Sequence, residues 1–229
     1  MGEQPQARAA LIIPALDEEP AIALTLSRVP RSLYREIIVA DNGSLDRTAE
    51  IARAAGATVV SEPERGYGAA CLRAMAALPP GIEAVVFMDA DSSDDPTQAV
   101  QLLEPIYTGR ADMVIGSRTL GQAEQGSLQP HQRFGNWLAT FLIHVLHGHR
   151  YTDLGPFRAI RLDSLRLLEM RDRNYGWTIE MQIKALRHKL RITEVPVTYR
   201  TRIGVSKISG NMQASVRAGI KILWKVVSC

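Results

Sequence analysis

The chain has 229 residues, 46% of them hydrophobic and 22% charged, which is the composition of a globular protein with a sizeable core. Its two cysteines, Cys71 and Cys229, lie too far apart in sequence to form a metal-ligand pair, and no apolar run is long enough to span a bilayer. The net charge of +3 is unevenly divided, because residues 1–110 carry 9 basic and 16 acidic side chains whereas residues 111–229 carry 18 and 8. An acidic first half and a basic second half suit a metal site joined to a site for anionic groups, and no nucleic-acid-binding motif is present.

Short apolar runs alternate with helical patterns along the first half of the chain. The runs are LIIPA (11–15), EIIVA (36–40), ATVVS (57–61), AVVFMD (84–89) and DMVIGS (112–117), and the helical patterns lie near residues 19–28, 46–55, 67–78 and 97–107. Near-continuous apolar strands separated by helices predict an α/β fold, with a mostly parallel sheet flanked by helices on both faces.

Polar residues follow every one of these predicted strands. They are LDEE, then DNGSLD, then Glu62, Glu64, Arg65 and Gly66, then Asp89 and Asp91, and finally Ser117 and Arg118. Ligands of parallel sheets bind beyond the carboxyl ends of the strands, so the sequence predicts one site at this rim.

The stretch VVFMDADSSDDP (85–96) places four carboxylates directly after a buried strand. Asp95 precedes Pro96, which suits the first turn of a helix, so Asp95 is expected to be an N-cap, with Asp94 near the positive helix end. Asp89 and Asp91 alternate around one small residue and would repel one another without a cation between them. Oxygen ligands suit Mg²⁺ or Mn²⁺, so we expect a metal site here, with a plain turn as the alternative.

The pattern changes after residue 118. TLGQAEQGSLQP (119–130) is rich in Gly and Gln and predicts a mobile loop that is typical of a lid. Apolar residues then recur at helical spacing, and we expect this stripe to face the core, with a membrane-surface face as the alternative. The stripe comprises Phe134, Trp137, Leu138, Phe141, Leu142, Val145 and Leu146. The tail SVRAGIKILWKVV (215–227) is a basic amphipathic helix candidate.

Eight motifs occur in a fixed order from residue 11 to about residue 210: PALDEE, IIVADNGSLDRT, ERGYGAA, FMDAD, VIGSR, TDLGPFRAIR, YGWTIEMQIKA and ITEVPVTYRTRIGVSKISG. In order and spacing they resemble glycosyltransferase family 2, on its dolichyl-phosphate-mannose-synthase-like side. The resemblance implies the GT-A fold, which is Rossmann-like, and Mg²⁺ or Mn²⁺ as cofactor. It also implies inverting transfer of a hexose from a nucleoside-diphosphate sugar, of the GDP-mannose or UDP-glucose type, to a polyprenyl or dolichyl phosphate.

The resemblance implies a role for particular residues. Asp89 and Asp91 would hold the metal, and Arg118 and Arg133 would hold the acceptor phosphate. The residues implied at the nucleotide-sugar site are Pro14, Leu16, Asp17, Glu18, Asp41, Gly66, Asp89, Ala90, Asp91, Arg202 and Lys207. The residues implied in catalysis are Asp91, Arg118, Asp153 and Glu180.

The acceptor decides whether a general base is needed. A phosphate acceptor is already ionised near neutral pH and needs none, whereas a hydroxyl acceptor needs a carboxylate within reach, for which Asp153 and Glu180 are the candidates. The sequence departs from the family pattern where Asn42 follows Asp41 and where Ser93 replaces a side-chain amide. These departures leave the sugar nucleotide and the acceptor open, and the sequence does not distinguish Mg²⁺ from Mn²⁺.

The patterns predict a single glycosyltransferase domain over residues 1–229, with a nucleotide-sugar-binding half (11–118), an acceptor-binding half (119–210) and an amphipathic tail (211–229). The two distant cysteines indicate a reducing, cytoplasmic compartment. The C-terminal amphipathic helices leave peripheral association with the cytoplasmic face of a membrane as an option. Two other functions stay open: a glycosyltransferase for a soluble hydroxyl acceptor, and a non-catalytic adaptor that binds sugar nucleotides. A sugar nucleotidyltransferase is disfavoured because LIIPALDEE lacks a G-G-x-G-T-R-like loop.

Overall fold

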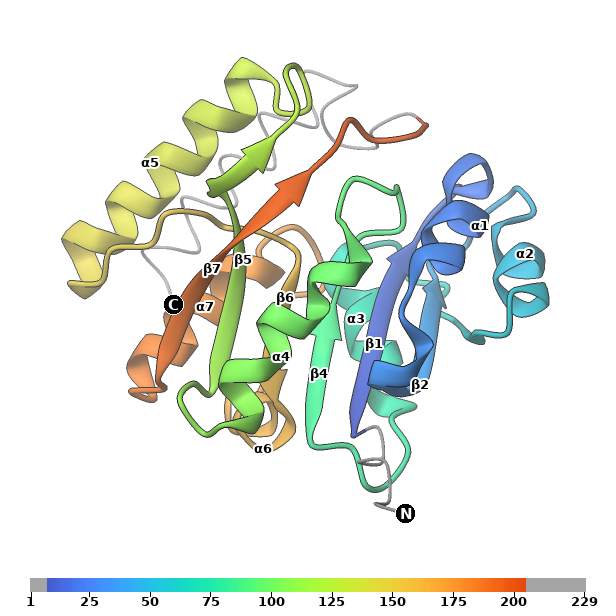
Figure 1. The fold of residues 1–229 in the computed structure, drawn as a ribbon, viewed down its shortest axis with the longest axis horizontal. Helices are drawn as coiled ribbons and strands as arrows, with labels where there is room; N and C mark the ends of the chain where they lie inside the picture. The colour runs from blue at the N-terminus through green and yellow to red at the C-terminus, as the bar shows by residue number, and fades with distance from the viewer. Residues whose placement is uncertain (1–7, 205–229) are drawn as a thin grey trace, which may run out of the picture.

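The computed structural model describes residues 8–204, which form one seven-stranded sheet with helices on both faces (Figure 1). The strands are β1 (Ala9–Ala15), β2 (Tyr34–Asp41), β3 (Thr58–Ser61), β4 (Ala84–Phe87), β5 (Met113–Ala123), β6 (Arg158–Arg161) and β7 (Ile192–Tyr199). They lie in the order β3-β2-β1-β4-β6-β5-β7, and β6 alone is antiparallel to its neighbours. The mostly parallel sheet expected from the sequence is therefore confirmed.

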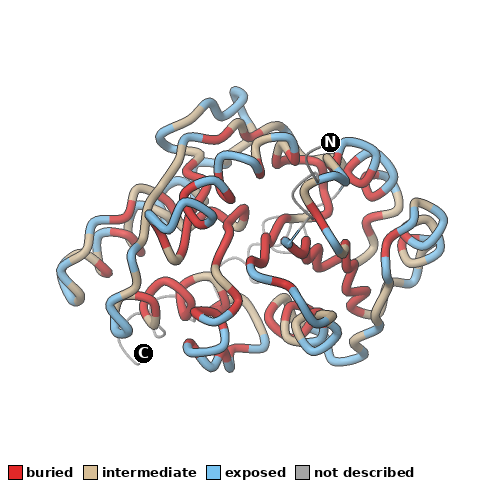
Figure 2. Tube along the Cα trace, turned by 60° about the horizontal axis from the view of Figure 1, so that its bottom comes forward, coloured by how far each residue is buried: buried red, intermediate tan, exposed pale blue. Residues whose placement is uncertain are grey.

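Two layers of helices cover the sheet. The helices are α1 (Glu19–Arg28), α2 (Thr48–Ala54), α3 (Tyr67–Ala76), α4 (Ala99–Tyr107), α5 (Pro130–His147), α6 (Leu162–Leu167) and α7 (Trp177–Arg187), with short 3-10 turns at η1 (Arg31–Leu33) and η2 (Pro96–Gln98). One core cluster joins the sheet to α1, α2 and α4, and the other joins it to α3, α5, α6 and α7. Figure 2 shows the buried segments gathered in the interior, with exposed segments around them.

Strand β1 shows why the runs are apolar without interruption. All seven of its residues are buried, and successive side chains enter opposite clusters: Ala10 and Ile12 one, Leu11 and Ile13 the other. Its parallel register pairs Ala15 with Asp41 of β2, and Asp41 with Ser61 of β3. The carboxyl ends of these strands therefore reach the same edge of the sheet, which is uppermost in Figure 1.

The loop predicted for residues 119–130 is wrong in its first part, because β5 continues to Ala123. The pairing of β5 with β7 resumes at Gln122 after a register shift that begins at Ser117. Gly121 permits this close approach, since a Cβ there would lie 2.0 Å from the carbonyl oxygen of Val197. The segment is thus part of a two-stranded ribbon, which the Gly and Gln content alone does not reveal.

The expectation that the 134–147 stripe faces the core is also wrong for most of its members. Ala139, Thr140 and Ile143 are the buried residues of α5, whereas Phe134 is 61% and Trp137 57% exposed. The exposed large side chains are Phe134, Trp137, Phe141, Val145 and Leu146, which we call the α5 aromatic face. Its rings pack on one another, with centroids 5.8 Å apart for Phe134–Trp137 and 5.7 Å apart for Trp137–Phe141.

The predicted amphipathic tail and Lys207 lie outside the described residues. Within residues 8–204, no helix has the length and apolar character needed to cross a bilayer.

Candidate active site

A cavity of about 370 Å³ opens at the carboxyl ends of β1, β2 and β4. Its lining comprises Pro14, Ala15, Leu16, Glu18, Asn42, Arg65, Gly66, Tyr67, Ala70, Asp89, Ala90, Asp91, Asn174, Tyr175 and Arg202. Most of the residues expected at the nucleotide-sugar site are brought together here, although Asp17 and Asp41 do not line it and Lys207 is not described.

Asp89 and Asp91 follow β4 directly, as the sequence predicts. Asp89 Oδ1 accepts a hydrogen bond from the Tyr67 hydroxyl at 3.2 Å, while Asp91 Oδ1 accepts from the backbone and hydroxyl of Ser93 at 3.0 and 2.5 Å. Asp91 Oδ2 lies 3.3 Å from a guanidinium nitrogen of Arg202. Burial, and then the charge of Asp91, raise the pKa of Asp89 to about 6.

Asp94 is a site residue that the sequence reasoning missed. Asp95 caps the following turn as expected, accepting from the backbone of Thr97 at 3.1 Å, but Asp94 turns inward and is only 2% exposed. One of its oxygens accepts from the backbone of Asp89 at 3.4 Å, and the other has no hydrogen-bond partner among the described residues. Burial and the neighbouring carboxylates of Asp89 and Asp91 raise its pKa well above the usual value.

This group of carboxylates fits a divalent cation. The pKa values of half-buried Asp89 and buried Asp94 are raised, and one oxygen of Asp94 is unsatisfied, so the site lacks positive charge, which a hard cation supplies. No complete set of three protein ligands is found within residues 8–204. A cation there would therefore take further ligands from water or from a phosphorylated substrate, as Mg²⁺ commonly does.

Arg118 and Asp153, both predicted from the resemblance, form a buried pair beside the cavity. Asp153, whose side chain is 1% exposed, accepts from the Arg118 backbone at 2.8 Å, from Nε at 2.8 Å and from Nη2 at 2.7 Å. Burial alone would lower the pKa of Arg118, but the hydrogen bonds and charge of Asp153 outweigh it and raise that pKa. The Arg118 guanidinium also stacks 5.0 Å from the centre of the Tyr199 ring.

The remaining predicted acceptor and catalytic residues lie outside this cavity. Arg133 is exposed in the first turn of α5 and does not line it. Glu180 is 1% exposed, accepts from the backbones of Arg171 and Asp172 at 3.1 and 2.6 Å, and pairs with Lys184 at 3.1 Å. These contacts hold the loop before α7, and a catalytic role for Glu180 stays a prediction.

Asp17 and Asp41 stabilise turns at the rim. Asp17 Oδ1 accepts from the backbone of Leu45 at 2.7 Å, and Asp41 Oδ1 accepts from the backbone of Ser44 at 3.3 Å. Asn42 uses its whole amide, donating to the carbonyls of residues 62 and 64 and accepting from the backbone of Gly66 at 2.7 Å. An aspartate at position 42 could not donate these bonds, which explains the amide in the sequence.

The sequence reasoning missed Tyr67, Asn174 and Tyr175 as lining residues. The loop that carries the last two lies against the start of α3, where a Cβ on Gly68 would meet the carbonyl oxygen of Asp172 at 1.9 Å. The G-x-G pattern at residues 66–68 was the available signal, because it marks a place where another backbone approaches closely.

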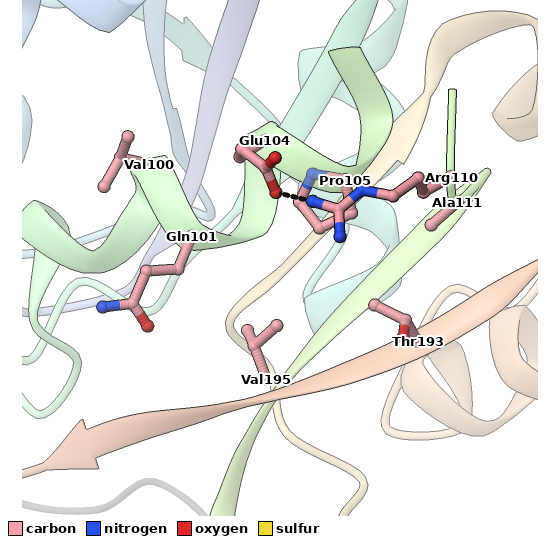
Figure 3. A pocket seen from close by; sticks show the side chains of 8 residues that line it. All are labelled: Val100, Gln101, Glu104, Pro105, Arg110, Ala111, Thr193 and Val195. Atoms are coloured by element: carbon pink, nitrogen blue, oxygen red, sulfur yellow. Dashed lines mark hydrogen bonds and ion pairs between the residues drawn. The ribbon is translucent and has the colours of Figure 1, made fainter. Parts of the chain in front are cut away.

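A second cavity, of about 460 Å³, lies between α4 and β7 (Figure 3). It is lined by Val100, Gln101, Glu104, Pro105, Arg110, Ala111, Thr193 and Val195. The charged pair on its wall, Glu104 and Arg110, is neutralised internally, and none of the predicted site residues lines this cavity. The first cavity is therefore the candidate active site.

Carboxylates at the end of a parallel strand, a guanidinium facing them and an adjoining cavity are typical of α/β proteins that bind a phosphorylated ligand with a divalent cation. The chain belongs to glycosyltransferase family 2, because residues 10–168 match the family described as Glycosyl transferase family 2.

Relatives agree with this assignment. An uncharacterised glycosyltransferase of Mycobacterium tuberculosis (strain ATCC 25618 / H37Rv) is 34% identical over 220 residues, covering 95% of this chain and 97% of its own. An undecaprenyl-phosphate mannosyltransferase of Micrococcus luteus is 33% identical over 221 residues, covering 90% and 89%.

A solved structure of glucosyl-3-phosphoglycerate synthase from Mycobacterium tuberculosis, in complex with Mn²⁺ and UDP-glucose, superposes with a TM-score of 0.75 at 25% identity, covering 96% of this chain and 78% of that one. The same enzyme with phosphoglyceric acid gives a TM-score of 0.76 at 25% identity, with coverage of 96% and 79%. The fold is thus GT-A, as the motifs implied, and the protein is a glycosyltransferase.

Proposed function

We propose that this glycosyltransferase moves a hexose from a nucleoside-diphosphate sugar to a polyprenyl phosphate, with inversion at the anomeric carbon. The observation that carries the proposal is the adjacency of two charged groups. The carboxylates Asp89 and Asp91 line the cavity, and Arg118 of the Arg118–Asp153 pair stacks on Tyr199, which pairs with Asp94 of the same carboxylate loop. One group suits a cation with a diphosphate, and the other suits the phosphate of an acceptor.

Asp89 and Asp91 would hold Mg²⁺ or Mn²⁺, and a cation there would stabilise the negative charge of the diphosphate leaving group. Pro14, Leu16 and the backbone at Gly66 would contact the nucleoside. As the bond from the sugar to the diphosphate breaks, charge grows on the leaving oxygen, and the guanidinium of Arg202 would stabilise it. Support for the cation comes from the related synthase, which is solved with Mn²⁺ and UDP-glucose.

A phosphate acceptor fits the state of Asp153. Its carboxylate accepts three hydrogen bonds from Arg118, so it is poorly placed to remove a proton from a hydroxyl. Nε and Nη2 of Arg118 are engaged with Asp153, while Nη1 has no hydrogen bond among the described residues and would bind the acceptor phosphate. The named relatives support a phosphorylated acceptor of one kind or another: undecaprenyl phosphate in one, phosphoglyceric acid in the other.

The α5 aromatic face supports a lipid rather than a soluble acceptor. Stacked aromatic rings at 48–61% exposure are typical of surfaces that enter the membrane interface. No acidic residue occurs between residues 125 and 152, whereas His131, Arg133 and Arg150 lie in this stretch and would favour anionic headgroups. Asn136 of α5 also accepts from the backbone of Leu154 at 2.9 Å, which ties the face to the Arg118–Asp153 region.

The donor site is tested by calorimetric titration of UDP, GDP and their sugar conjugates, with and without Mn²⁺. We expect metal-dependent binding of one nucleotide class, lost in Asp91→Asn. Incubation of that donor with undecaprenyl phosphate, with phosphoglyceric acid and with a simple hydroxyl acceptor then separates the acceptors. Nucleotide binding without turnover on any acceptor would instead indicate a sugar-nucleotide-binding adaptor, and no nucleotide binding by folded protein would refute the proposal.

The membrane contact is tested by co-sedimentation with vesicles that contain anionic lipid. We expect Trp137→Ala with Phe141→Ala to reduce binding. The matched control is Leu45→Ala, since Leu45 is 90% exposed but lies away from α5. Equal binding of all three proteins would rule out the α5 aromatic face as the contact. No binding by any of them at low salt would remove the membrane from the proposal and leave a soluble phosphorylated acceptor. The proposed single transferase domain over residues 1–229, with a donor half at 11–118 and an acceptor half at 119–210, does not depend on this membrane contact.

A further inference from the structure

The segment after β7 runs back along the carboxylate loop. The backbone of Ile203 donates to the carbonyl of Asp91 at 2.9 Å, and the backbone of Arg200 donates to the carbonyl of Ser93 at 2.7 Å. Next to the second bond, Tyr199 and Asp94 form an antiparallel bridge. This pairing holds the segment that carries Arg202, which lines the cavity.

The guanidinium of Arg202 bridges two carboxylates from different loops. Nη2 lies 3.0 Å from Glu18 Oε1, and Nη1 lies 3.3 Å from Asp91 Oδ2. The two carboxylate side chains are 9% and 7% exposed, whereas that of Arg202 is 30% exposed. Its Nε is buried and has no hydrogen-bond partner among the described residues, so the guanidinium is incompletely satisfied in this position.

This contact occupies the oxygen of Asp91 that a cation would use. The other oxygen, Oδ1, already accepts two hydrogen bonds from Ser93. A cation would therefore bind at Oδ2, where it would repel the guanidinium of Arg202, whose Nη1 lies 3.3 Å from the same oxygen. The Arg202 contact is also weaker than the bonds of Ser93, because it is single, longer and more exposed.

We propose that Arg202 is the resident counter-ion of the metal site, and that it leaves Asp91 when a divalent cation and a nucleoside diphosphate bind together. The inference rests on the proposed function and deepens it, by naming how metal and donor binding depend on one another. Glu18 and Asp91 hold the guanidinium while no cation is bound. The diphosphate supplies the new anionic partner for Arg202, so each ligand favours the binding of the other.

Competition between Arg202 and the cation for Asp91 predicts that one substitution has opposite effects on Mn²⁺ affinity and on nucleotide affinity. Arg202→Gln removes the competing cation, so we expect Mn²⁺ alone to bind about tenfold more tightly, which corresponds to about 1.4 kcal/mol. The same variant loses a partner for the diphosphate, so nucleotide binding in saturating Mn²⁺ becomes weaker. A purely structural role for Arg202 would weaken both. Arg202→Lys keeps the charge but loses the two-pronged contact, and we expect it to fall between the wild type and Arg202→Gln for Mn²⁺ alone.

Arg200→Gln is the matched control. Arg200 is on the same segment and pairs with Asp95 at 2.8 Å, but it does not line the cavity. We expect its Mn²⁺ affinity to equal that of the wild type.

The experiment measures free Mn²⁺ by electron paramagnetic resonance during titration of each protein, first alone and then with UDP or GDP. Tighter Mn²⁺ binding by Arg202→Gln, with weaker nucleotide binding, supports the inference. Unchanged or weaker Mn²⁺ binding by Arg202→Gln, in a protein whose wild type binds Mn²⁺ with nucleotide, overturns the inference and leaves the proposed function intact. If neither the wild type nor any variant binds Mn²⁺ or nucleotide, the proposed function fails and the inference with it.

Discussion

The Arg118–Asp153 pair predicts a large loss of stability from a nearly isosteric change. Asp153→Asn keeps the size of the side chain but removes the charge opposite a guanidinium that is 14% exposed. Removal of one partner of a buried ion pair costs about 3–5 kcal/mol, because the other charge stays buried without compensation. The asparagine carbonyl can still accept one hydrogen bond, so we expect the lower end, a loss of about 3 kcal/mol in the free energy of unfolding.

The assay is urea unfolding followed by tryptophan fluorescence. With an m-value of about 3 kcal/mol/M for a chain of this size, a loss of about 3 kcal/mol lowers the unfolding midpoint by about 1 M. Asp112→Asn is the matched control, since Asp112 makes a similar forked contact to Arg191 at 2.7 Å, but that arginine is 54% exposed. There we expect a loss of no more than about 1 kcal/mol.

Two outcomes would contradict this reasoning. If Asp153→Asn cost less than about 1 kcal/mol, the pair would behave like an exposed one, and Arg118 would be free to give its whole fork to a phosphate. A double-mutant cycle with Arg118→Met measures the coupling directly, and a coupling near zero would show that the two side chains act independently.

Three further predictions concern the rest of the site and its frame. The pKa of Asp89 is raised to about 6, so its carboxyl takes up a proton as the pH falls through that value. Mn²⁺ should therefore bind about tenfold more weakly at pH 5 than at pH 7.5. Electron paramagnetic resonance of free Mn²⁺ measures this difference. Gly121→Ala should lower the free energy of unfolding by about 3 kcal/mol, because the new Cβ would meet the backbone of Val197. Gly135→Ala in α5 should raise it by about 0.8 kcal/mol, because alanine favours the helix and the new Cβ would have no atom within 4 Å. Urea unfolding midpoints compare the two variants. Glu180→Gln should lower the urea midpoint by the equivalent of about 2 kcal/mol and leave kcat of the folded protein near the wild-type value, while a large fall in kcat with unchanged stability would establish catalysis by Glu180.

The strands that position the donor site could be predicted because each is buried on both faces. Apolar residues at every position of β1 and β4 mark such strands, although the usual alternation of apolar and polar residues is absent. Strands β6 and β7 give no such signal. Strand β6 has only four residues, and β7 contains Pro196, which is tolerated because β7 is an edge strand with one paired side.

Helix α5 shows a second limit of sequence patterns. Its apolar residues recur at helical spacing, which correctly predicts an amphipathic helix. The spacing does not tell which partner covers the apolar side, and here the core takes Ala139, Thr140 and Ile143 while the large aromatic side chains stay exposed. Residue size was misleading, because α5 packs against α7 through residues that do not include its rings.

The charges of the site were predicted by type but not by partner. The sequence separates an acidic first half from a basic second half, which suggested a metal site joined to a site for anionic groups. The fold instead joins the two kinds of charge: Arg118 is held by Asp153, and Arg202 by Glu18 and Asp91, over sequence separations that no local pattern encodes. Each arginine can therefore bind an anion only if it leaves its carboxylate partner or contacts the carboxylate and the anion at the same time. This makes the binding of phosphate groups depend on displaced protein contacts, and a cation on Asp91 is the event that would release Arg202 toward the diphosphate.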